Sequence, residues 1–301
     1  MKAGEMPGLA VRREKGWLVA NRWLLARRFT QLAILLLFLP GPWFGWWIVK
    51  GNLSSSLTLD VLPLTDPLLL QQVLMSGHLP EAIAAVSAFI VLAFYLLVGG
   101  RVYCSWVCPV NMVTDAAEWL RMRLNLKGGA SLSRRLRWWM LGLVLLLPAV
   151  TGALTWELIN PVSMMHRGLI FGMGLAWAVV LGIFLLDLLI VRRAWCGHLC
   201  PVGAFYGLLG RWSLLRVSAV NRAACDDCMD CFAVCPEKQV IAPALKGEAK
   251  GHGPVIDSGL CTNCGRCIDV CARDVFRFTQ RFDNRVRPAT AGSTHQSEVS
   301  P

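Results

Sequence analysis

The stretch RVYCSWVCPV, residues 101–110, places two cysteines four positions apart, the second directly before a proline, where a long apolar run ends. The stretch RRAWCGHLCPV, residues 192–202, repeats this arrangement with its cysteines 92 positions later. The four motif cysteines are Cys104, Cys108, Cys196 and Cys200. A repeat of this kind predicts a chain of two halves, each a helix pair that delivers one Cys-x3-Cys-Pro motif to a shared interface.

Two interpretations of these motifs stay open. On a helix, cysteines at i and i+4 lie on one face, where they can bind one metal ion or exchange electrons as a dithiol. Thiols from both motifs could complete one tetrahedral site. The alternative is interfacial anchoring, in which arginine and aromatic residues mark a helix end and proline stops the helix. Anchoring does not explain four cysteines, so we expect a redox site or a further metal site here.

The composition indicates a membrane protein. The 301 residues are 55% hydrophobic and 16% charged, with a mean hydropathy of +0.51. A bilayer core of about 30 Å requires about 20 mainly apolar residues per helix. Four runs approach this length, at about 29–49, 81–99, 138–155 and 168–191. The sequence therefore predicts an all-α membrane domain over residues 29–214, with four transmembrane helices in two repeated helix pairs.

The basic residues predict the orientation. Lys and Arg number 7 in residues 1–28, 1 in 50–80, 7 in 100–137, 1 in 156–167 and 14 beyond 191. This alternation predicts a multi-pass protein of the bacterial inner membrane with cytoplasmic N- and C-termini, including a basic N-terminal segment 1–28. The twin arginines before the first run resemble an export signal, but no small-residue cleavage site follows, so we expect a retained anchor. Topology accounts for the net charge of +11, and we expect no nucleic-acid partner.

Eight further cysteines form two C-x2-C-x2-C-x3-C runs, CDDCMDCFAVC and CTNCGRCIDVC. Bacterial ferredoxins use this spacing to bind [4Fe-4S] clusters, and in two-cluster forms the fourth cysteine of each run binds the other cluster. Zinc needs only four ligands, and disulfides are disfavoured in the cytoplasm. The predicted first cluster has the ligands Cys225, Cys228, Cys231 and Cys271, and the second has Cys261, Cys264, Cys267 and Cys235.

Residues 215–285 are therefore predicted to form a small cytoplasmic ferredoxin-like α+β domain with two [4Fe-4S] clusters. The remaining residues, 286–301, are small and polar, and we expect them to be disordered. Adjacent clusters of this type relay single electrons, so the domain predicts electron transfer rather than catalysis.

A quinol from the membrane pool is the predicted electron donor. No histidine lies inside a predicted span, which disfavours an intramembrane haem. Quinol oxidation needs a proton acceptor, and Asp187 is an intramembrane carboxylate close to the predicted cytoplasmic end. Pairing of Asp187 with Arg192 or Arg101 is an equally good interpretation. Glu157, on the predicted outer side, either lines a quinol pocket or solvates its loop.

The segments YCSWVCPVN, WELINPVS, WCGHLCPVGAFYG and CMDCFAVCPE together resemble the NapH family, the ferredoxin-type membrane subunit of periplasmic nitrate reductase systems. The resemblance covers about residues 15–280. It implies the membrane subunit of a quinol dehydrogenase that works with a periplasmic iron–sulfur subunit. Such a subunit passes electrons toward periplasmic nitrate reductase, by way of multihaem cytochromes. The resemblance also implies that the Cys-x3-Cys-Pro motifs are functional.

One physical difficulty keeps other functions open. The clusters are predicted in the cytoplasm, whereas the implied acceptor is periplasmic, so electrons would have to cross a core of about 30 Å. The alternatives are an assembly or maturation factor for a metalloenzyme, a redox sensor, a docking scaffold, or an equivalent electron-transfer subunit for methylamine oxidation.

Overall fold

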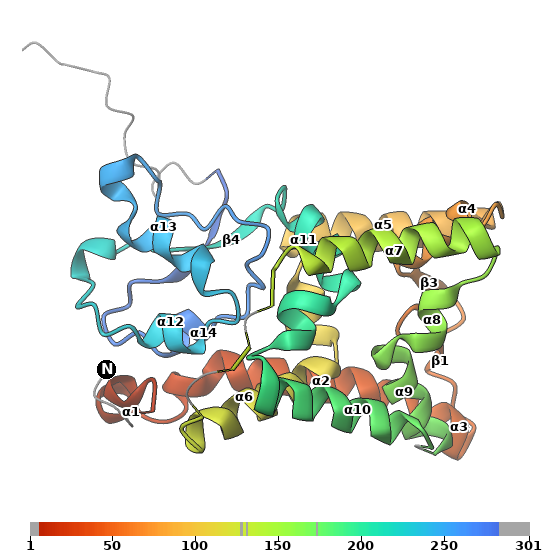
Figure 1. The fold of residues 1–301 in the computed structure, drawn as a ribbon, viewed down its shortest axis with the longest axis horizontal. Coiled ribbons are helices and arrows are strands. Elements are labelled where there is room, and N and C mark those ends of the chain that lie inside the picture. Colours follow the sequence, from red (N-terminus) through yellow and green to blue (C-terminus); the bar gives the residue numbers. More distant parts are fainter. Residues whose placement is uncertain (1–5, 127–128, 131, 173, 283–301) are drawn as a thin grey trace, which may run out of the picture.

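The computed structural model describes residues 6–126, 129–130, 132–172 and 174–282. Figure 1 shows a body of long helices and a smaller domain, formed by the C-terminal part of the described chain, lying end to end. The predicted disordered tail, 286–301, lies outside the described residues.

A long apolar helical stretch follows the first short helix. After α1 (Leu9–Lys15), the turn η1 (Val19–Asn21) leads into α2 (Arg22–Phe38), and α3 (Pro40–Phe44) continues it. Proline at the start of α3 keeps the helical direction because the first helical position needs no N–H donor. Gly45, with φ of 76°, ends the stretch in the left-handed conformation.

The prediction of four transmembrane helices is wrong. Within the described residues, the stretch Val19–Phe44 is the one helix long and apolar enough to cross a membrane, at 26 residues. The other predicted spans form shorter helices: α5 (Ala82–Val98), α7 (Leu136–Thr151), and α10 (Ala176–Leu185) continued by the π-helix η3 (Leu186–Ile190). These helices have 17 residues, 16 residues, and ten plus the five of η3.

Glycines give the physical reason for the short helices. Gly99, Gly152 and Gly172 have φ of 131°, 69° and 99°, a region that glycine enters without a steric cost. Gly99 ends α5 and Gly152 ends α7. Gly172 ends α9 (Pro161–Phe171) and so separates the start of the fourth predicted run from α10. Hydropathy averages over such breaks and therefore overestimates helix length.

The helical body is not all-α either. The strands β1 (Val49–Gly51), β2 (Ser55–Thr58) and β3 (Leu62–Thr65) form an antiparallel sheet in the order β1-β2-β3. The register pairs Val49 with Thr58 and Ser56 with Leu64. The helix α4 (Pro67–Met75) follows, and the Asp66 side chain accepts a hydrogen bond from the Leu68 N–H at 2.9 Å as its N-cap. Figure 1 shows this sheet at the end of the body far from the smaller domain.

Each Cys-x3-Cys-Pro motif forms a π-helical turn followed by a helix. The turn η2 (Tyr103–Val107) leads into α6 (Val110–Arg123), and η4 (Trp195–Leu199) leads into α11 (Pro201–Gly210). The Cys108 N–H donates to the Tyr103 carbonyl at 3.0 Å, and the Cys200 N–H donates to the Trp195 carbonyl at 2.9 Å. The two motifs thus share one backbone conformation, with a wider turn than the α-helix that an i, i+4 pattern indicates. The short α8 (Thr155–Ile159) precedes α9.

All three tyrosines of the chain pack together in the core of the body. The rings of Tyr103 and Tyr206 stack with centroids 5.1 Å apart, and the Tyr95 ring meets Tyr206 edge-on at 4.9 Å. The Tyr206 hydroxyl donates to the Asp66 carboxylate at 3.1 Å. This cluster therefore joins α5, η2 and α11 to the capped start of α4.

The smaller domain, from residue 215 onward, has a ferredoxin-like α+β organisation. Its strands β4 (Leu215–Ser218) and β5 (Arg277–Gln280) pair antiparallel, with Val217 opposite Phe278. Val217, Ile241, Ile256 and Phe276 form part of its buried core. The helical elements between the strands are η5 (Arg222–Ala224), α12 (Asp230–Val234), η6 (Lys238–Val240), α13 (Ile241–Lys246), η7 (Glu248–Lys250) and α14 (Arg266–Asp269).

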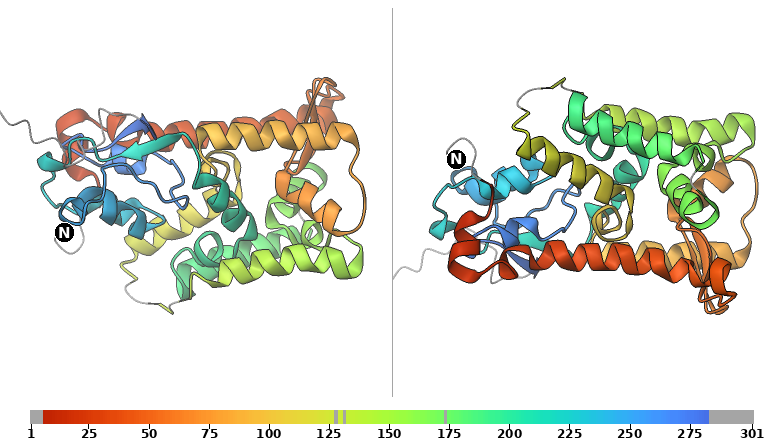
Figure 2. Two further views of the ribbon diagram at one scale, coloured as in Figure 1. Left: turned by 90° about the horizontal axis from the view of Figure 1, so that it is seen from above. Right: turned by 90° about the horizontal axis from the view of Figure 1, so that it is seen from below.

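The N-terminal helix packs on this domain rather than on the body (Figure 2). The Gly8 N–H donates to the Asp230 carboxylate at 2.8 Å, and Lys15 pairs with Asp274 at 2.6 Å. The Asp269 carboxylate accepts the N–H groups of Trp23 and Leu24, both at 3.1 Å. The smaller domain therefore caps the first N–H groups of α2 and anchors the N-terminal end of this helix.

Candidate functional site: three cysteine-lined cavities

Two small cavities of about 20 Å³ each lie inside the smaller domain. Cys225, Cys228, Cys231 and Cys271 line one of them. Cys235, Cys261, Cys264 and Cys267 line the other. In each set, three cysteines come from one run and the fourth comes from the other run, which is the grouping that the spacing predicts. Binding of a cluster by each set stays a prediction.

The backbone gives both runs the same shape. Asp227 and Asn263 occupy equivalent positions and have φ of 56° and 47°, and Met229 and Gly265 have φ of 65° and 71°. Left-handed residues at these two positions turn the chain tightly between successive cysteines. Short polar residues and glycine adopt this conformation at low cost, whereas Met229 does so with strain.

The cysteine side chains of the two runs are unpaired and grouped around the small cavities. All twelve are free thiols. Within the described ranges, no group of three or more His, Cys, Asp or Glu side chains is close enough to hold one metal ion. The four thiols of each set line one enclosed space, an arrangement that fits a multi-atom iron–sulfur group.

A third cavity, of about 390 Å³, lies between the two motifs and the smaller domain. Its walls come from α2, η2, α6, α8, the start of α9, η4, the start of α11 and both cysteine runs. Five cysteines line it: Cys104, Cys108, Cys196, Cys200 and Cys264. The structure thus brings the four motif cysteines together around one space, and a predicted ligand of the second cluster shares its wall.

Arg101, which precedes the first motif, joins both motifs to the smaller domain. It is buried and donates to the Glu237 carboxylate at 2.8 Å, the Leu260 carbonyl at 3.0 Å and the Cys196 carbonyl at 3.3 Å. Burial alone would raise the pKa of Glu237, but Arg101 and Arg137 outweigh it and lower that pKa to about 2. Glu237 is therefore ionised and holds Arg101 in place beside the motif.

Further side chains of the first motif reach the second cysteine run. The Ser105 hydroxyl donates to the Thr262 carbonyl at 2.7 Å, and the Trp106 indole N–H donates to the Asn263 carbonyl at 3.1 Å. These two carbonyls lie between Cys261 and Cys264 in the chain. The motif and the predicted second cluster are thus held together by side-chain contacts.

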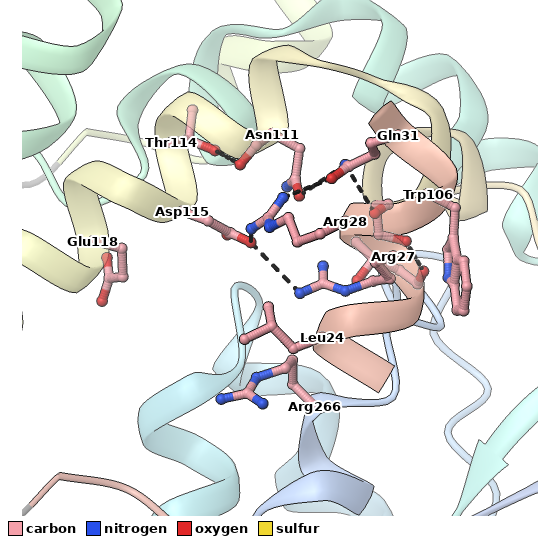
Figure 3. A network of polar contacts seen from close by, with 12 residues as sticks. Leu24, Arg27, Arg28, Gln31, Trp106, Asn111, Thr114, Asp115, Glu118 and Arg266 are labelled. Carbon is pink, nitrogen blue, oxygen red and sulfur yellow. Dashed lines mark hydrogen bonds and ion pairs between the residues drawn. The ribbon is translucent and has the colours of Figure 1, made fainter. Parts of the chain in front are cut away.

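A buried ionic cluster forms one side of the large cavity (Figure 3). Asp115 on α6 pairs with Arg193 at 2.8 Å, with Arg27 at 3.5 Å and with Arg28. Burial would raise the pKa of Asp115, but these guanidinium groups outweigh it and lower that pKa to about 2. Glu118, one turn further along α6, pairs with Arg192 and lies 3.9 Å from Arg193.

Sequence reasoning missed this ionic cluster. The available signal was the segment VNMVTDAAEWLRMR, which directly follows the first motif and carries two carboxylates three positions apart. Such residues lie on one face of a helix, next to the motif.

The two predicted acidic candidates lie outside the walls of this cavity. One Asp187 oxygen accepts the Trp195 N–H at 3.1 Å, and the other has no hydrogen-bond partner among the described residues. Its predicted partners are engaged elsewhere, Arg192 with Glu118 and Arg101 with Glu237. Glu157 on α8 accepts hydrogen bonds from Ser54 and Ser163. A role for either carboxylate in quinol oxidation stays a prediction.

Comparison with protein families matches both parts of the chain. A family described as "4Fe-4S binding domain" matches residues 82–127 and again 173–218, so each half carries one Cys-x3-Cys-Pro motif within the matched region. A family described as "4Fe-4S dicluster domain" matches residues 224–275. The double match agrees with the predicted internal repeat.

Curated relatives match over nearly the whole chain. "Ferredoxin-type protein NapH" of Haemophilus influenzae is 49% identical over 94% of this chain and 98% of its own length. "Ferredoxin-type protein NapH" of Escherichia coli is 50% identical over 90% and 94%. "Methylamine utilization ferredoxin-type protein MauN" of Paracoccus denitrificans is 57% identical over 89% and 94%. No solved structure matches. The resemblance to the NapH family is confirmed: this chain belongs to the family of ferredoxin-type proteins that includes NapH and MauN.

Proposed function

We propose that this protein is the membrane subunit of a quinol dehydrogenase, which takes electrons from the membrane quinone pool into its iron–sulfur domains. One observation carries the proposal: the four motif cysteines and Cys264 line the same cavity of about 390 Å³. A donor bound there would lie beside both 4Fe-4S-type domains of the chain. The family names support ferredoxin-type electron transfer, and oxidation of quinol goes beyond them.

The cofactors follow from the cysteine sets. The first cluster is assigned to Cys225, Cys228, Cys231 and Cys271, and the second to Cys261, Cys264, Cys267 and Cys235. To the motif cysteines we assign a further iron–sulfur group, because the 4Fe-4S family matches both halves of the repeat. Bound clusters of this type supply one-electron transfer.

The proposed location is the bacterial inner membrane. The helix Val19–Phe44 supports it by length and composition. The outward faces of α5, α7 and α10 also expose large apolar side chains, such as Phe89, Leu146 and Trp177. Because α1 packs on the smaller domain, the basic N-terminus and the cysteine runs lie at one end of the molecule, and the seven Lys and Arg of residues 1–28 support a cytoplasmic location for that end.

The proposed partner is a periplasmic iron–sulfur subunit that delivers electrons to periplasmic nitrate reductase, by way of multihaem cytochromes. Identities of 49% and 50% to NapH proteins support this system. Methylamine oxidation is the second candidate, because a MauN protein is 57% identical.

Anaerobic EPR spectroscopy of the protein in lipid, after addition of a quinol analogue, tests the proposal. Reduced [4Fe-4S] signals are the expected result. The Cys264→Ser variant should lose about four iron atoms per chain, the content of one cluster, and with it the quinol-dependent signal. Clusters that dithionite reduces but quinol leaves oxidised, even with the partner present, would contradict quinol oxidation. That result would favour redox sensing or an assembly role.

A further inference from the structure

We propose that the part of the large cavity between α2 and α6 binds the quinol head group, with Glu118 as the proton acceptor. This inference rests on the proposed function and adds the place of binding and the base. Arg27 on α2 and Glu118 on α6 are the two charged groups that would contact the head group (Figure 3).

The size of the cavity suits an organic ligand. Pockets for small molecules have volumes of about 300–1,000 Å³. The large cavity has about 390 Å³, whereas the two cavities inside the smaller domain have about 20 Å³ each. Because the two cysteine sets assigned to clusters enclose so little space, the large cavity has room for an iron–sulfur group at the motif cysteines and for a ring-sized molecule beside it.

Apolar side chains line the part near α6. Leu24, Met112, Trp119 and Met122 belong to the walls. Trp119 is 49% exposed and Met122 is 39% exposed, so these side chains extend from the cavity to the molecular surface. An apolar, aromatic entrance favours a flat apolar ring over a hydrophilic substrate.

The cavity also adjoins the apolar helix. Leu24, Arg27 and Arg28 line it and lie within the stretch Val19–Phe44, the candidate membrane span. A ligand dissolved in the bilayer could thus enter beside this helix without crossing water.

Two buried charges have unused hydrogen-bonding capacity at this place. Glu118 is 5% exposed and Arg27 is 4% exposed. Among the described residues, Glu118 Oε2 and Arg27 Nε have no hydrogen-bond partner. A buried polar atom without a partner is costly, and a ligand that supplies the partner recovers this cost. A hydroquinone hydroxyl can donate to Glu118, and its oxygen can accept from Arg27.

Glu118 is better placed than Asp115 to pass a proton from the cavity to water. Three guanidinium groups surround Asp115 and keep it ionised, so it binds a proton weakly. Glu118 pairs with Arg192, whose side chain is partly exposed, and lies at the edge of contact with Arg193. Glu118 therefore lies between the cavity and a group that reaches water, as a proton acceptor must.

The reaction balances with the groups named. Both O–H bonds of the hydroquinone break and its two C–O bonds become carbonyls, which releases two electrons and two protons. The iron–sulfur groups that the cysteine sets of this chain would hold would accept these electrons one at a time. The Glu118 carboxylate takes the first proton, releases it to water beside Arg192, and then takes the second.

Photolabelling with an azido-quinone in lipid, followed by mass spectrometry of the peptides, tests the site. Label on residues 110–123 and 22–38, suppressed by excess unlabelled quinol analogue, is the expected result. Trp119→Ala should reduce labelling about tenfold, since it removes an aromatic wall. Glu118→Gln should retain labelling but slow quinol-dependent cluster reduction about 100-fold, the scale of a lost general base. Glu81→Gln, which alters an exposed carboxylate outside the cavity, is the matched control.

The outcomes separate this inference from the proposed function. Label confined to residues 136–151, none of which lines the cavity, together with a wild-type rate in Glu118→Gln, would overturn the site while quinol oxidation stands. A wild-type protein that shows no competed label and no reduction by quinol would overturn both. If Glu118→Gln lacks the cluster absorbance of the wild type, the labelling of Trp119→Ala decides, and unchanged labelling of that variant rejects the site.

Discussion

At the scale of single residues, Arg101 links three parts of the chain. It donates to Glu237 and to the Leu260 and Cys196 carbonyls, and so contacts the smaller domain and the second motif from a position next to the first motif. Loss of Arg101 removes one of the three guanidinium partners of Glu237, and a hydrogen bond to a charged group contributes about 1.5–3 kcal/mol.

Substitution Arg101→Gln should therefore lower the thermal unfolding temperature by an amount equivalent to about 1.5–3 kcal/mol. The measurement is thermal unfolding in detergent, followed through the iron–sulfur absorbance. Arg135→Gln, on an exposed arginine beside the Arg134 and Arg137 partners of Glu237, is the control and should stay within about 0.5 kcal/mol. Equal effects of both substitutions would show that the contacts of Arg101 contribute no stability.

Asp115 should confer a pH-dependent stability. Its pKa is about 2 in the folded protein, against about 3.9 in an unfolded chain. Its contribution is present above pH ~4 and is lost as the pH falls toward 2, and two units correspond to about 2–3 kcal/mol. Asp115→Asn should therefore be less stable by about this amount, uniformly from about pH 5 to 8, when unfolding is measured across that range. A destabilisation that varies within that range would assign the effect to another group.

The sequence predicted those site residues whose spacing indicates their chemistry. It missed the site residues that come together only when distant segments of the chain meet. The eight cysteines of the two runs are grouped around two cavities as their spacing indicates. The Arg101–Glu237 pair joins residues 136 positions apart, and no local pattern marks it. Asp115 and Glu118 form their ion pairs with arginines outside α6, which no local pattern on α6 indicates.

At the scale of elements, glycines set how closely backbone segments approach, both within the body and between the body and the smaller domain. A Cβ at Gly100 would lie 2.0 Å from the Tyr206 carbonyl oxygen on α11. A Cβ at Gly210 would lie 2.7 Å from the Gly259 carbonyl oxygen. Backbone atoms cannot move aside as a flexible side chain can, so these positions require glycine for close approach.

Gly100→Ala should therefore destabilise the protein by about 1–3 kcal/mol, as overpacking does. Gly142→Ala is the matched control. Gly142 lies inside α7, and a Cβ there would meet no atom of another segment within 4 Å. Alanine in that helix should be neutral or stabilise by about 0.5–1 kcal/mol. Unfolding of both variants under the same conditions checks the contrast, and a neutral Gly100→Ala would refute the close-approach argument.

Element lengths were the least predictable feature. Hydropathy located the helical segments α5, α7 and α10, yet it extended them into spans because it does not register where a glycine ends a helix. The strands β1–β3 escaped prediction because each is three or four residues long, too short for a clear alternation.

At the scale of the whole molecule, the smaller domain is held from two sides. The body contacts it through the first motif, and α1 covers it from the N-terminus (Figure 1). Val11 of α1 is buried, and Gly8 approaches Val270 next to Cys271. This helix therefore shields part of the first cysteine set.

Removal of residues 1–16 should accelerate the loss of iron–sulfur absorbance in the presence of a chelator. Burial of one valine side chain contributes about 1.5–3 kcal/mol, enough for about a tenfold change in rate. Lys15→Ala is the control, because the partly exposed pair with Asp274 contributes about 0–1 kcal/mol. Identical rates in the truncated and full-length proteins would exclude a protective role of α1.

The tyrosine cluster gives this protein a built-in spectroscopic reporter. Because the three tyrosines of the chain pack together in one place, and Tyr103 also lines the large cavity, all ring vibrations of tyrosine originate beside the motif cysteines. Ring-deuterated tyrosine would shift these bands away from those of the other aromatic residues. A difference spectrum between oxidised and reduced protein would then show how the environment of the tyrosine rings beside the motifs changes with redox state, without any substitution in the chain.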